Sequence, residues 1–456
     1  MVGRYKAYPE YKNTDIKFLK NIPTHWVTSK VKYISSFGRG LSITKADLQD
    51  SGVPCVSYGE VHSMFGFEVD PKRHLLKCVN EEYLKTSSYA LLSKGDFVFA
   101  DTSEDIDGSG NFTQLISDEK VFAGYHTVIV RPNLKNHYRF IAYLFDSAEF
   151  RIQIQDAVKG VKVFSITQAI LKSADVWFPS YEEQQKIANF LDHEIAKIDT
   201  LIAKQEKLIE LLKEKRQAVI SHVVTKGLNP DVSMKDSGVE WLGEVPEHWV
   251  VSKLKFESEI IDCRNKTPEY HSEGEYFVVR TTNVKNQQLN FNGALYTDEK
   301  NFKIWTQRGI PPVGSILFTR EAPTGEVCRV PNNLKFCMGQ RMMNFIAKDK
   351  MYADYLFDYL ISDCLERYIG SVSHGSTVSH LRVEQVENIP VLVPSRDEII
   401  SIHNEISKLK LSYDALVSKV ASTIELLKER KTALISAAVT GKIDVRDWQE
   451  LIEKQG

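Results

Sequence analysis

Residues 11–34 read YKNTDIKFLKNIPTHWVTSKVKYI, and residues 234–257 read MKDSGVEWLGEVPEHWVVSKLKFE, at an offset of 223 (234 − 11). Both stretches carry the motif Pro-x-His-Trp. A second pair of similar stretches lies near the end of each half: KLIELLKEKRQAVISHVVTKG at 207–227 and STIELLKERKTALISAAVTGK at 422–442, at an offset of 215 (422 − 207). Two copies of one long unit predict two similar domains related by a pseudo-two-fold axis.

The composition is that of a globular protein with two domains. The chain has 456 residues, of which 43% are hydrophobic and 26% are charged, and this length exceeds one ordinary core. No apolar run is long enough to predict a membrane span. The six cysteines are scattered without a C-x-x-C pair, which argues against a zinc site and a disulfide framework and fits a reducing cytoplasm. The net charge of −2 by itself disfavours a simple nucleic-acid binder, but it can hide local basic surfaces.

Two segments are expected to form long helices. Residues 182–225 contain no Gly or Pro, and their apolar residues recur at alternating steps of three and four, which is a heptad pattern. Pro179 and Gly227 bracket this segment, and Pro394 and Gly441 bracket its repeat. The predicted seam between the two helices consists of Ile195, Ile198, Ile202, Ile209, Leu212, Val417, Val420, Ile424, Leu427 and Leu434.

The two helices are expected to pair with each other in antiparallel directions. In a parallel pair the repeat would place Arg216 beside Lys431, whereas antiparallel pairing sends these like charges to opposite ends. A helix of about 40 residues is roughly 60 Å long, so the pair predicts a rigid spacer with a globular domain at each end. The alternative is that each helix packs only on its own domain, which leaves Leu201, Leu208 and Leu211 without a partner.

The globular segments, about 25–178 and 248–393, are each expected to be α+β domains. Strand-like runs correspond at 95–102 and 314–321 and at 126–132 and 341–347, and helix-like runs correspond at 138–157 and 352–369. By contrast, segments 35–94 and 258–313 share little beyond a strand-like rhythm. We therefore expect the matched parts to be scaffold, and the unmatched parts to face two different targets.

Signatures of catalysis are missing from the sequence. It contains neither a G-x-x-x-x-G-K-[ST] loop nor an H-E-x-x-H pair. The acidic run TSEDIDGSG at 102–110 has no counterpart in the other half, so it is interpreted as a solvated loop rather than a metal-dependent nuclease site. His25 and His248 stand beside Pro and Trp and are interpreted as packing or turn residues, because the repeat supplies no nucleophile or carboxylate next to them.

Three stretches resemble the DNA specificity subunit of Type I restriction–modification enzymes: MKDSGVEWLGEVPEHW at 234–249, PSYEEQQKIANFLD at 179–192 and AVISHVVTKG at 218–227. The resemblance covers essentially the whole chain in both halves. It departs from the family pattern at the start of the second helix, where PSRDEIISIHNEI at 394–406 lacks the Glu-Gln pair.

The resemblance implies an α+β fold with two target-recognition domains separated by an antiparallel coiled coil of two long helices. The expected boundaries are 1–180 for the first target-recognition domain with its N-terminal segment, 181–226 for the first spacer helix, 227–394 for the second target-recognition domain, 395–441 for the second spacer helix and 442–456 for a C-terminal tail.

The resemblance also implies a function without an active site in this chain. Each domain would read one half of a bipartite, asymmetric site on double-stranded DNA, and the helices would fix the spacing and dock two modification (methyltransferase) subunits. Neither a cofactor nor a metal is expected here: S-adenosylmethionine would belong to the modification subunits, and ATP and Mg to the complex with the restriction (motor nuclease) subunits.

Sequence reading requires polar and basic side chains at the edges of the DNA grooves, with further basic groups on phosphates. Loops after strand-like segments can supply both. In the first domain the candidates are Arg39, Lys45, Tyr58, Arg73, His74, Ser109, Asn111, His126, Lys159 and Lys162. In the second domain they are Arg264, Lys266, Arg280, Thr281, Asn283, Arg320, Arg341, His374 and Ser376.

Two other functions stay open at this point. The first is a coiled-coil adaptor with two protein-binding heads and no DNA specificity, which the net charge of −2 supports. Steep salt dependence of DNA binding would separate a DNA reader from such an adaptor. The second is a nuclease or methyltransferase active by itself, which the missing cofactor, metal and nucleophile signatures disfavour.

Overall fold

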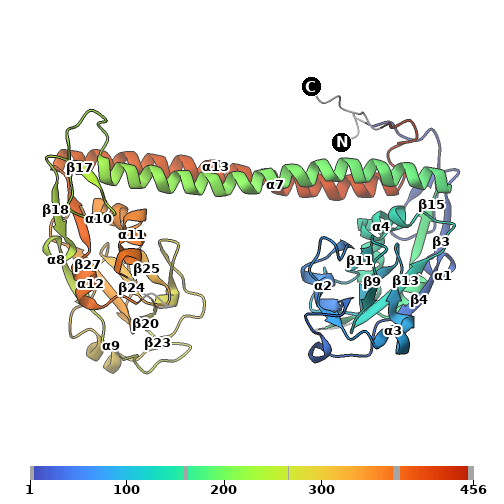
Figure 1. The fold of residues 1–456 in the computed structure, drawn as a ribbon, viewed down its shortest axis with the longest axis horizontal. Helices are drawn as coiled ribbons and strands as arrows, with labels where there is room; N and C mark the ends of the chain where they lie inside the picture. The colour runs from blue at the N-terminus through green and yellow to red at the C-terminus, as the bar shows by residue number, and fades with distance from the viewer. Residues whose placement is uncertain (1–4, 159–162, 265, 373–379, 450–456) are drawn as a thin grey trace. The chain divides into compact units, whose positions relative to one another are not determined.

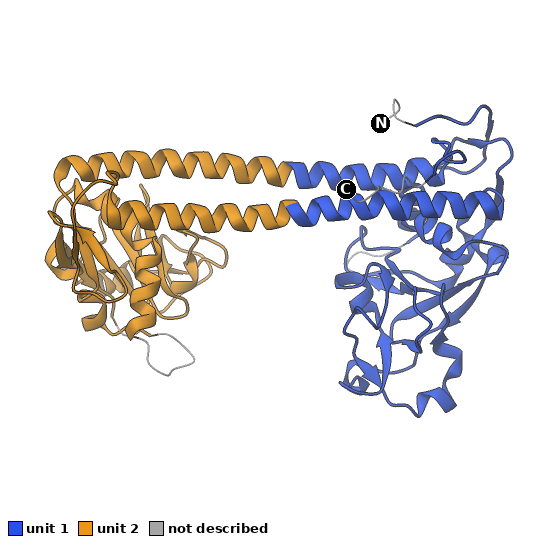
Figure 2. Cartoon of the chain, turned by 45° about the horizontal axis from the view of Figure 1, so that its top comes forward, with its two compact units in different colours: residues 1–204, 423–456 blue, residues 205–422 orange. Residues whose placement is uncertain are grey.

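The computed structural model describes residues 5–158, 163–264, 266–372 and 380–449. The chain forms two compact units: unit 1 comprises residues 1–204 and 423–456, and unit 2 comprises residues 205–422 (Figure 2). Two long helices contribute to both units, namely α7 (Tyr181–Lys226, 46 residues) and α13 (Arg396–Val439, 44 residues). Each unit therefore contains one end of each long helix.

Unit 1 is built around a five-stranded sheet (Figure 1). Its strands lie in the order β4 (Ser35–Arg39), β13 (Thr127–Pro132), β9 (Phe97–Ala100), β11 (Phe112–Leu115) and β6 (Phe67–Val69). A second sheet has the order β7 (Cys78–Val79), β5 (Val53–Val56), β12 (Val121–Ala123) and β8 (Leu91–Leu92). The remaining pairs are β1 (Tyr11–Asn13) with β2 (Asn21–Pro23), β3 (Val27–Lys30) with β15 (Asp175–Phe178) and β10 (Thr102–Ser103) with β14 (Phe164–Ser165).

The helices of unit 1 pack on these sheets and contribute Phe140, Tyr143, Phe145 and Phe150 to its core. They are α1 (Val31–Ile34), α2 (Tyr58–Ser63), α3 (Tyr83–Thr86), α4 (Tyr138–Asp146), α5 (Ala148–Ala157) and α6 (Gln168–Ser173), with short 3-10 turns at Lys45–Asp47 and Ser88–Ala90. Phe97 and Phe99 of the sheet contact Phe145 of α4, with ring centroids 5.0 and 5.5 Å apart. Residues of α7 and α13 belong to the same core, which fixes α4 between the sheet and the long helices (Figure 1).

Unit 2 repeats the plan with a four-stranded sheet. Its order is β19 (Ser258–Asp262), β27 (Met342–Ala347), β24 (Ile316–Arg320) and β25 (Thr324–Arg329), and all neighbours are antiparallel. A second sheet has the order β23 (Tyr296–Thr297), β20 (Tyr276–Val279) and β26 (Phe336–Met338). The remaining pairs are β16 (Met234–Asp236) with β17 (Glu244–Pro246), β18 (Val250–Lys253) with β28 (Pro390–Val393) and β21 (Val284–Lys285) with β22 (Gln288–Leu289).

Tyrosines of one helix fix the scaffold of unit 2. Besides the long helices, this unit contains α8 (Leu254–Glu257), α9 (Glu299–Trp305), α10 (Tyr352–Leu360), α11 (Asp363–Val372), α12 (Val383–Glu387) and a 3-10 turn at Thr281–Asn283. Tyr352 and Tyr359 of α10 donate to carbonyl oxygens of β28 at 2.8 and 2.9 Å, and Tyr355 donates to the Val224 carbonyl of α7 at 2.7 Å. Burial raises the pKa of each phenol, so all three remain neutral donors.

The Pro-x-His-Trp motif anchors each domain to the first turn of a long helix. In unit 1, Glu183 of α7 accepts from Trp26 Nε1 at 3.0 Å and lies 2.9 Å from His25 Nε2. In unit 2, Glu398 of α13 accepts from Trp249 Nε1 at 3.1 Å and lies 2.8 Å from His248 Nε2. In the structure a long helix thus supplies a carboxylate to each histidine, Glu183 to His25 and Glu398 to His248.

The helix-like runs at 138–157 and 352–369 are helical in the structure, and each consists of two helices: α4 and α5 in unit 1, and α10 and α11 in unit 2. The first breaks at Ser147, whose backbone is extended (ψ 147°) and whose hydroxyl caps α5 by accepting from the Phe150 N–H at 3.3 Å. The second breaks at Ile361 and Ser362, between α10 and α11. A capping serine stops a helix because its side chain replaces a backbone partner, and the apolar periodicity on both sides hid this break.

The long helices run antiparallel inside each unit, as predicted. In unit 1, Lys186 of α7 donates to the carbonyl of Arg446, beyond the end of α13, and Asp199, further along α7, pairs with Lys431, which precedes Arg446. In unit 2, Arg216 pairs with Asp414. The predicted seam positions are buried or half-buried, whereas other apolar positions of the two helices remain exposed, among them Leu201, Leu208, Leu211, Leu411, Leu416 and Leu426.

Candidate nucleic-acid interface

Two repeat-related residues stand at the start of corresponding strands in an uncommon backbone conformation. His126 precedes β13 with φ 54°, and Arg341 precedes β27 with φ 68°. The backbone N–H of Asp101 donates to the His126 carbonyl at 3.1 Å, and that of Arg320 donates to the Arg341 carbonyl at 2.9 Å. Residues other than glycine rarely adopt positive φ, and such positions concentrate at functional sites. The same end of the main sheet is thus specialised in both units.

In unit 1 an aromatic and imidazole-rich group surrounds this strand end, here termed strand-end cluster 1 and consisting of Tyr58, His62, Asp101, Asn111 and His126. The Tyr58 ring stands edge-on to His62 and His126, with ring centroids 6.3 and 5.5 Å away. The Asp101 carboxylate lies 3.2 Å from His126 Nδ1. His126 is exposed, and the other members are half-buried.

A chain of hydrogen bonds orients the polar groups of strand-end cluster 1. His62 Nε2 lies 2.8 Å from the Thr102 carbonyl oxygen and therefore donates to it. His62 Nδ1 then accepts from Asn111 Nδ2 at 3.0 Å, and the Asn111 side-chain oxygen accepts from Arg151 at 2.6 Å. These hydrogen bonds orient the His62 imidazole, so the cluster presents positioned donors and acceptors beside an aromatic face.

In unit 2 the corresponding strand end is rich in arginine. Strand-end cluster 2 consists of Arg264, Arg320, Glu321, Arg341 and His380. Glu321 accepts from Arg341 and lies 2.8 Å from His380 Nδ1. The guanidinium of Arg264 stacks over the Trp305 ring at 5.5 Å, and Arg320 lies 3.7 Å from the Asp262 carboxylate.

The charges of strand-end cluster 2 are only partly neutralised within the protein. Arg320 is almost fully buried, whereas the Arg341 side chain is 43% exposed and can reach outward. The Arg341 N–H donates to Cys263 Sγ at 3.1 Å, and burial raises the pKa of that thiol, so the wall behind Arg341 is neutral. The two strand ends share a backbone position and differ in chemistry.

Arg39, Arg73 and His74 make side-chain contacts with residues outside strand-end cluster 1, although the backbone of Arg39 pairs with Val128 of β13. Arg39 stacks over Tyr89 at 5.5 Å, and Lys45 is exposed in a 3-10 turn. Arg73 pairs with Glu68 at 2.9 Å and with Asp70, and His74 stacks on Phe65. Arg73 and His74 line a separate hollow of about 420 Å³.

Several predicted residues act inside the fold. Ser109 is fully buried, and its hydroxyl donates to the carbonyl of Asp105. Asn283 is 1% exposed and caps a turn by accepting from the Arg280 N–H at 3.0 Å. Arg280 also donates to the Gly293 carbonyl, and Thr281 donates to the carbonyl of Ala322, beside strand-end cluster 2. Lys266 is exposed.

Four predicted residues lie outside the described residues: Lys159, Lys162, His374 and Ser376. The described residues that follow them do reach the strand ends. Phe164–Ser165 pair with Thr102–Ser103 in unit 1, and His380 bridges to Glu321 in unit 2.

Sequence reasoning missed His62, Arg308 and His380. Arg308 donates to the Asp262 carboxylate at 3.1 Å and to the Cys263 carbonyl. His62 and Arg308 occur in segments where the two halves of the sequence diverge, so repeat logic gave no signal for either. His380 could have been found from its place just after the candidates His374 and Ser376.

The described part of the chain contains no group of His, Cys, Asp or Glu side chains arranged to hold a metal ion. Within the same residues, none of the helices combines the length and the apolar character needed to cross a membrane.

Comparison with known proteins gives one consistent family. Residues 23–211 and 246–433 each match the family model described as "Type I restriction modification DNA specificity domain". The chain is 25% identical over 457 residues to a putative type I restriction enzyme MjaX specificity subunit of Methanocaldococcus jannaschii, covering 98% of this chain and 100% of that protein. It is 22% identical to the type I restriction enzyme EcoKI specificity subunit of Escherichia coli (strain K12), covering 94% and 91%.

Solved structures show a similar fold. One chain, from a study titled as the structural basis of complex assembly and conformational transition of the type I R-M system, superposes with a TM-score of 0.63. The superposition covers 92% of this chain and 99% of that chain at 15% sequence identity.

Proposed function

Because this chain belongs to the Type I restriction–modification DNA specificity family, whose members are specificity subunits and not themselves catalytic, we propose that it selects the DNA sequence on which partner subunits act. Unit 1 reads one half of a bipartite, asymmetric site on double-stranded DNA, and unit 2 reads the other. The observation that carries this proposal is the pair of strand ends with one backbone geometry and two different sets of side chains.

The side chains of strand-end cluster 1 suit a half-site read through single hydrogen bonds and stacking. His126 offers an exposed imidazole beside the Tyr58 ring, and the Asn111 amide holds His62 in place through its bonds to His62 and Arg151. Arg39 and Lys45 are exposed cations suited to phosphate contacts, which position a protein without specifying bases.

The side chains of strand-end cluster 2 suit a half-site that contains guanine. An arginine side chain can donate two parallel hydrogen bonds to the O6 and N7 atoms of guanine in the major groove. Arg341 fits this role because Glu321 orients its guanidinium while 43% of the side chain stays exposed. Arg264 and Lys266, two residues apart in sequence, supply cations for phosphates.

The long helices have two roles in this proposal. They fix the distance between the half-sites, and they dock two modification subunits. The exposed leucines on their outer faces, such as Leu208 on α7 and Leu426 on α13, support docking, because apolar positions outside a seam need a cover. The modification subunits would then bind S-adenosylmethionine, and the assembly with restriction subunits would bind ATP and Mg. The complex would work in the cytoplasm.

Exchanging residues 30–178 for the corresponding domain of a relative tests this function. We expect the methylated adenines, mapped by methylome sequencing of cells that carry the partner subunits, to change in one half of the recognised sequence only. A change in both halves, or in neither, would contradict the proposal. If DNA binding by the assembled complex does not depend steeply on salt concentration, a protein adaptor is favoured instead.

A further inference from the structure

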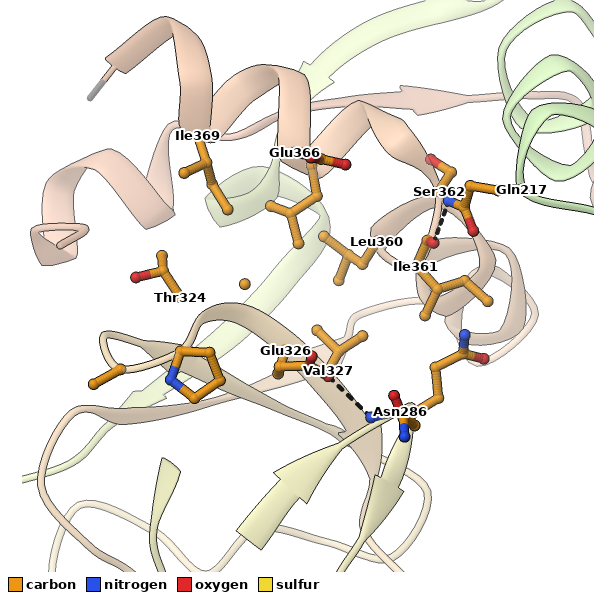
Figure 3. Close-up of a pocket in the computed structure, with 15 residues that line it drawn as sticks. Gln217, Asn286, Thr324, Glu326, Val327, Leu360, Ile361, Ser362, Glu366 and Ile369 are labelled. Atoms are coloured by element: carbon orange, nitrogen blue, oxygen red, sulfur yellow. Dashed lines mark hydrogen bonds between the residues drawn. The ribbon is translucent and has the colours of Figure 1, made fainter. Parts of the chain in front are cut away.

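A groove of about 700 Å³ in unit 2 has no role in the function proposed above. It lies between α11, which contributes Leu365, Glu366 and Ile369, and β25, which contributes Glu326 and Val327 (Figure 3). We name it the α11 groove. Its far end is closed by Asn286 and Gln217, whose side-chain N–H donates to the Ile361 carbonyl at 2.8 Å.

The repeat shows what covers the same helix face in unit 1. Helix α5 is the copy of α11 at an offset of 215, so Arg151 corresponds to Glu366 and Ile154 to Ile369. The long connection 101–111, between β9 and β11, lies on this face of α5. Arg151 donates to the Asp107 carbonyl at 2.9 Å, and a Cβ placed on Gly110 would stand 3.5 Å from Ile154.

The corresponding connection in unit 2 is shorter, although it too approaches α11 at Gly325, the copy of Gly110, where an added Cβ would stand 2.6 Å from Ile369. Strand β24 ends at Arg320 and β25 begins at Thr324, so only residues 321–323 join them. Ile154 is fully buried under the loop of unit 1, whereas Ile369 is only partly covered and lines the α11 groove. The α11 groove therefore lies at the position that the connection 101–111 fills on α5 in unit 1.

The charge of the groove indicates what can take that place. In unit 1 a cation, Arg151, meets a loop that carries Glu104, Asp105 and Asp107. In unit 2 the same helix position holds an exposed anion, Glu366, and Glu326 of β25 lines the same groove, where its carboxylate accepts from the Asn286 N–H at 3.2 Å. The described residues that line the groove include these two carboxylates and neither Lys, Arg nor His. Such a lining repels DNA phosphates.

We propose that the α11 groove binds a segment of a partner protein in which Lys or Arg alternates with an apolar side chain. The apolar side chains would lie on the partly exposed Ile369, next to the buried Leu365 and Val327 that also line the groove. The cations would reach Glu326 and Glu366, since charged hydrogen bonds of this type are the strong ones. Because the equivalent face of unit 1 is covered by its own loop, the chain binds one such segment and not two.

A labelled peptide, Gly-Lys-Leu-Gly-Arg-Leu-Gly, is the probe, and its fluorescence anisotropy is measured with the full chain. We expect saturable binding of one peptide per chain. The double substitution Glu326→Lys/Glu366→Lys should weaken the binding by about tenfold or more, as the loss of one charged contact does. The same peptide with Glu in place of Lys and Arg should not bind.

Two further double variants serve as controls. Glu273→Lys/Glu384→Lys changes the net charge equally at exposed positions outside the groove and should bind as the original chain does. Glu326→Gln/Glu366→Gln keeps the side-chain shape and should still lose affinity, which covers the case that charge reversal harms folding. Equal binding by all variants, or no saturation up to about 1 mM peptide, overturns the proposal. Neither outcome bears on DNA reading by the strand-end clusters.

Discussion

Lys431 of α13 donates to Asp199 of α7 at 2.7 Å in unit 1. Its repeat counterpart is the pair formed in unit 2 by Arg216 and Asp414, which are 2.9 Å apart. A shift of 215 residues converts Asp199 into Asp414 and Arg216 into Lys431. Each ion pair thus joins an acidic or basic residue of α7 to the repeat counterpart of the opposite charge on α13. Two copies of one helix produce this pattern when they pair in antiparallel directions.

Reversing Asp199 to Lys should destabilise unit 1 slightly, because two cations would then face each other. Exposed pairs of this kind contribute about 0.2–1 kcal/mol, so we expect a coupling of about 0.5 kcal/mol in a double-mutant cycle with Lys431→Asp, read from urea unfolding. The exposed pair Lys207–Glu210, which lies within one helix, is a control for charge reversal alone. Strictly additive effects at positions 199 and 431 would contradict the pairing.

Removing the carboxylate of Glu183 should destabilise the protein strongly. This side chain is 8% exposed and serves Tyr8 Oη at 2.6 Å as well as Trp26 Nε1 at 3.0 Å. Glu183→Ala would leave both donors unpaired in the interior, at a cost of about 2–4 kcal/mol. Glu398→Ala is the matched variant in unit 2 and should have the smaller effect, since Glu398 is more exposed. Equal midpoints of denaturant unfolding for both variants would refute this ranking.

Asp146 should make unit 1 less stable as the pH rises. Burial raises the pKa of this carboxyl to about 6, against the smaller opposing effects of Arg151 and Lys431. The unfolded value is about 3.9, so the folded state binds more protons between these two values, and stability falls with pH across that window. Asp146→Asn cannot ionise, and we expect it to be about 1–2 kcal/mol more stable than the original chain at pH 8.

Thermal unfolding at several pH values checks this prediction. The gap between Asp146→Asn and the original chain should become small near pH 4 and close below about pH 3, where the carboxyl is protonated in both states. Asp15→Asn, at an exposed position of the same unit, should show no such gap at any pH. A gap that is the same at pH 4 and pH 8 would mean that ionisation of Asp146 is not its cause.

Single substitutions at the two strand ends should weaken different half-sites. We expect His126→Ala to lower affinity for duplexes with an intact first half-site by about 1–3 kcal/mol, and Arg341→Ala to do the same for the second. Affinity is measured with the assembled complex on duplexes in which one half-site at a time is altered. Arg396→Ala, at a well-exposed side chain at the start of α13, should affect neither. Loss at both half-sites in either variant would show a general effect on DNA binding.

Inserting one heptad into α7 should change the spacing between half-sites or abolish assembly, and leave the bases that are read unchanged. The reason is that seven residues lengthen a helix by about 10 Å while preserving its apolar seam. Methylome sequencing reports both the bases and their spacing. A lengthened chain that assembles with its partner subunits and keeps the original spacing would exclude the proposed spacing role.

The long helices could be predicted from the sequence because their signal is local. The stretch 182–225 has a heptad period and no Gly or Pro, and α7 spans Tyr181–Lys226. The role of the Pro-x-His-Trp motif could not be predicted in the same way. The partner of His25 is Glu183, which is 158 residues away in sequence. Glu183 lies on α7, and its contact with His25 forms only when the domain packs against that helix.

The sequence predicts the candidate DNA contacts as types of residue in loops, and the structure shows which of these side chains are occupied inside the fold. Ser109 and Asn283 have side chains suited to reading bases, yet each satisfies backbone groups inside its own turn. Small polar residues do this often, because their side chains compete for local backbone partners. His126 and Arg341 differ from them in one respect that a sequence does not display: a positive φ at the start of a strand.

The composition of unit 1 from residues 1–204 and 423–456 has a consequence for the order of events on the ribosome. Domains that are continuous in sequence commonly fold as they emerge, with the N-terminal one first. Here Leu434, Ala438 and Val445 belong to the core of unit 1, so this core stays incomplete until these residues have left the exit tunnel. Unit 2 is continuous and can close earlier. Most of unit 1 is thus synthesised first, but its core is completed last. Until then its apolar surface is exposed to aggregation and proteolysis.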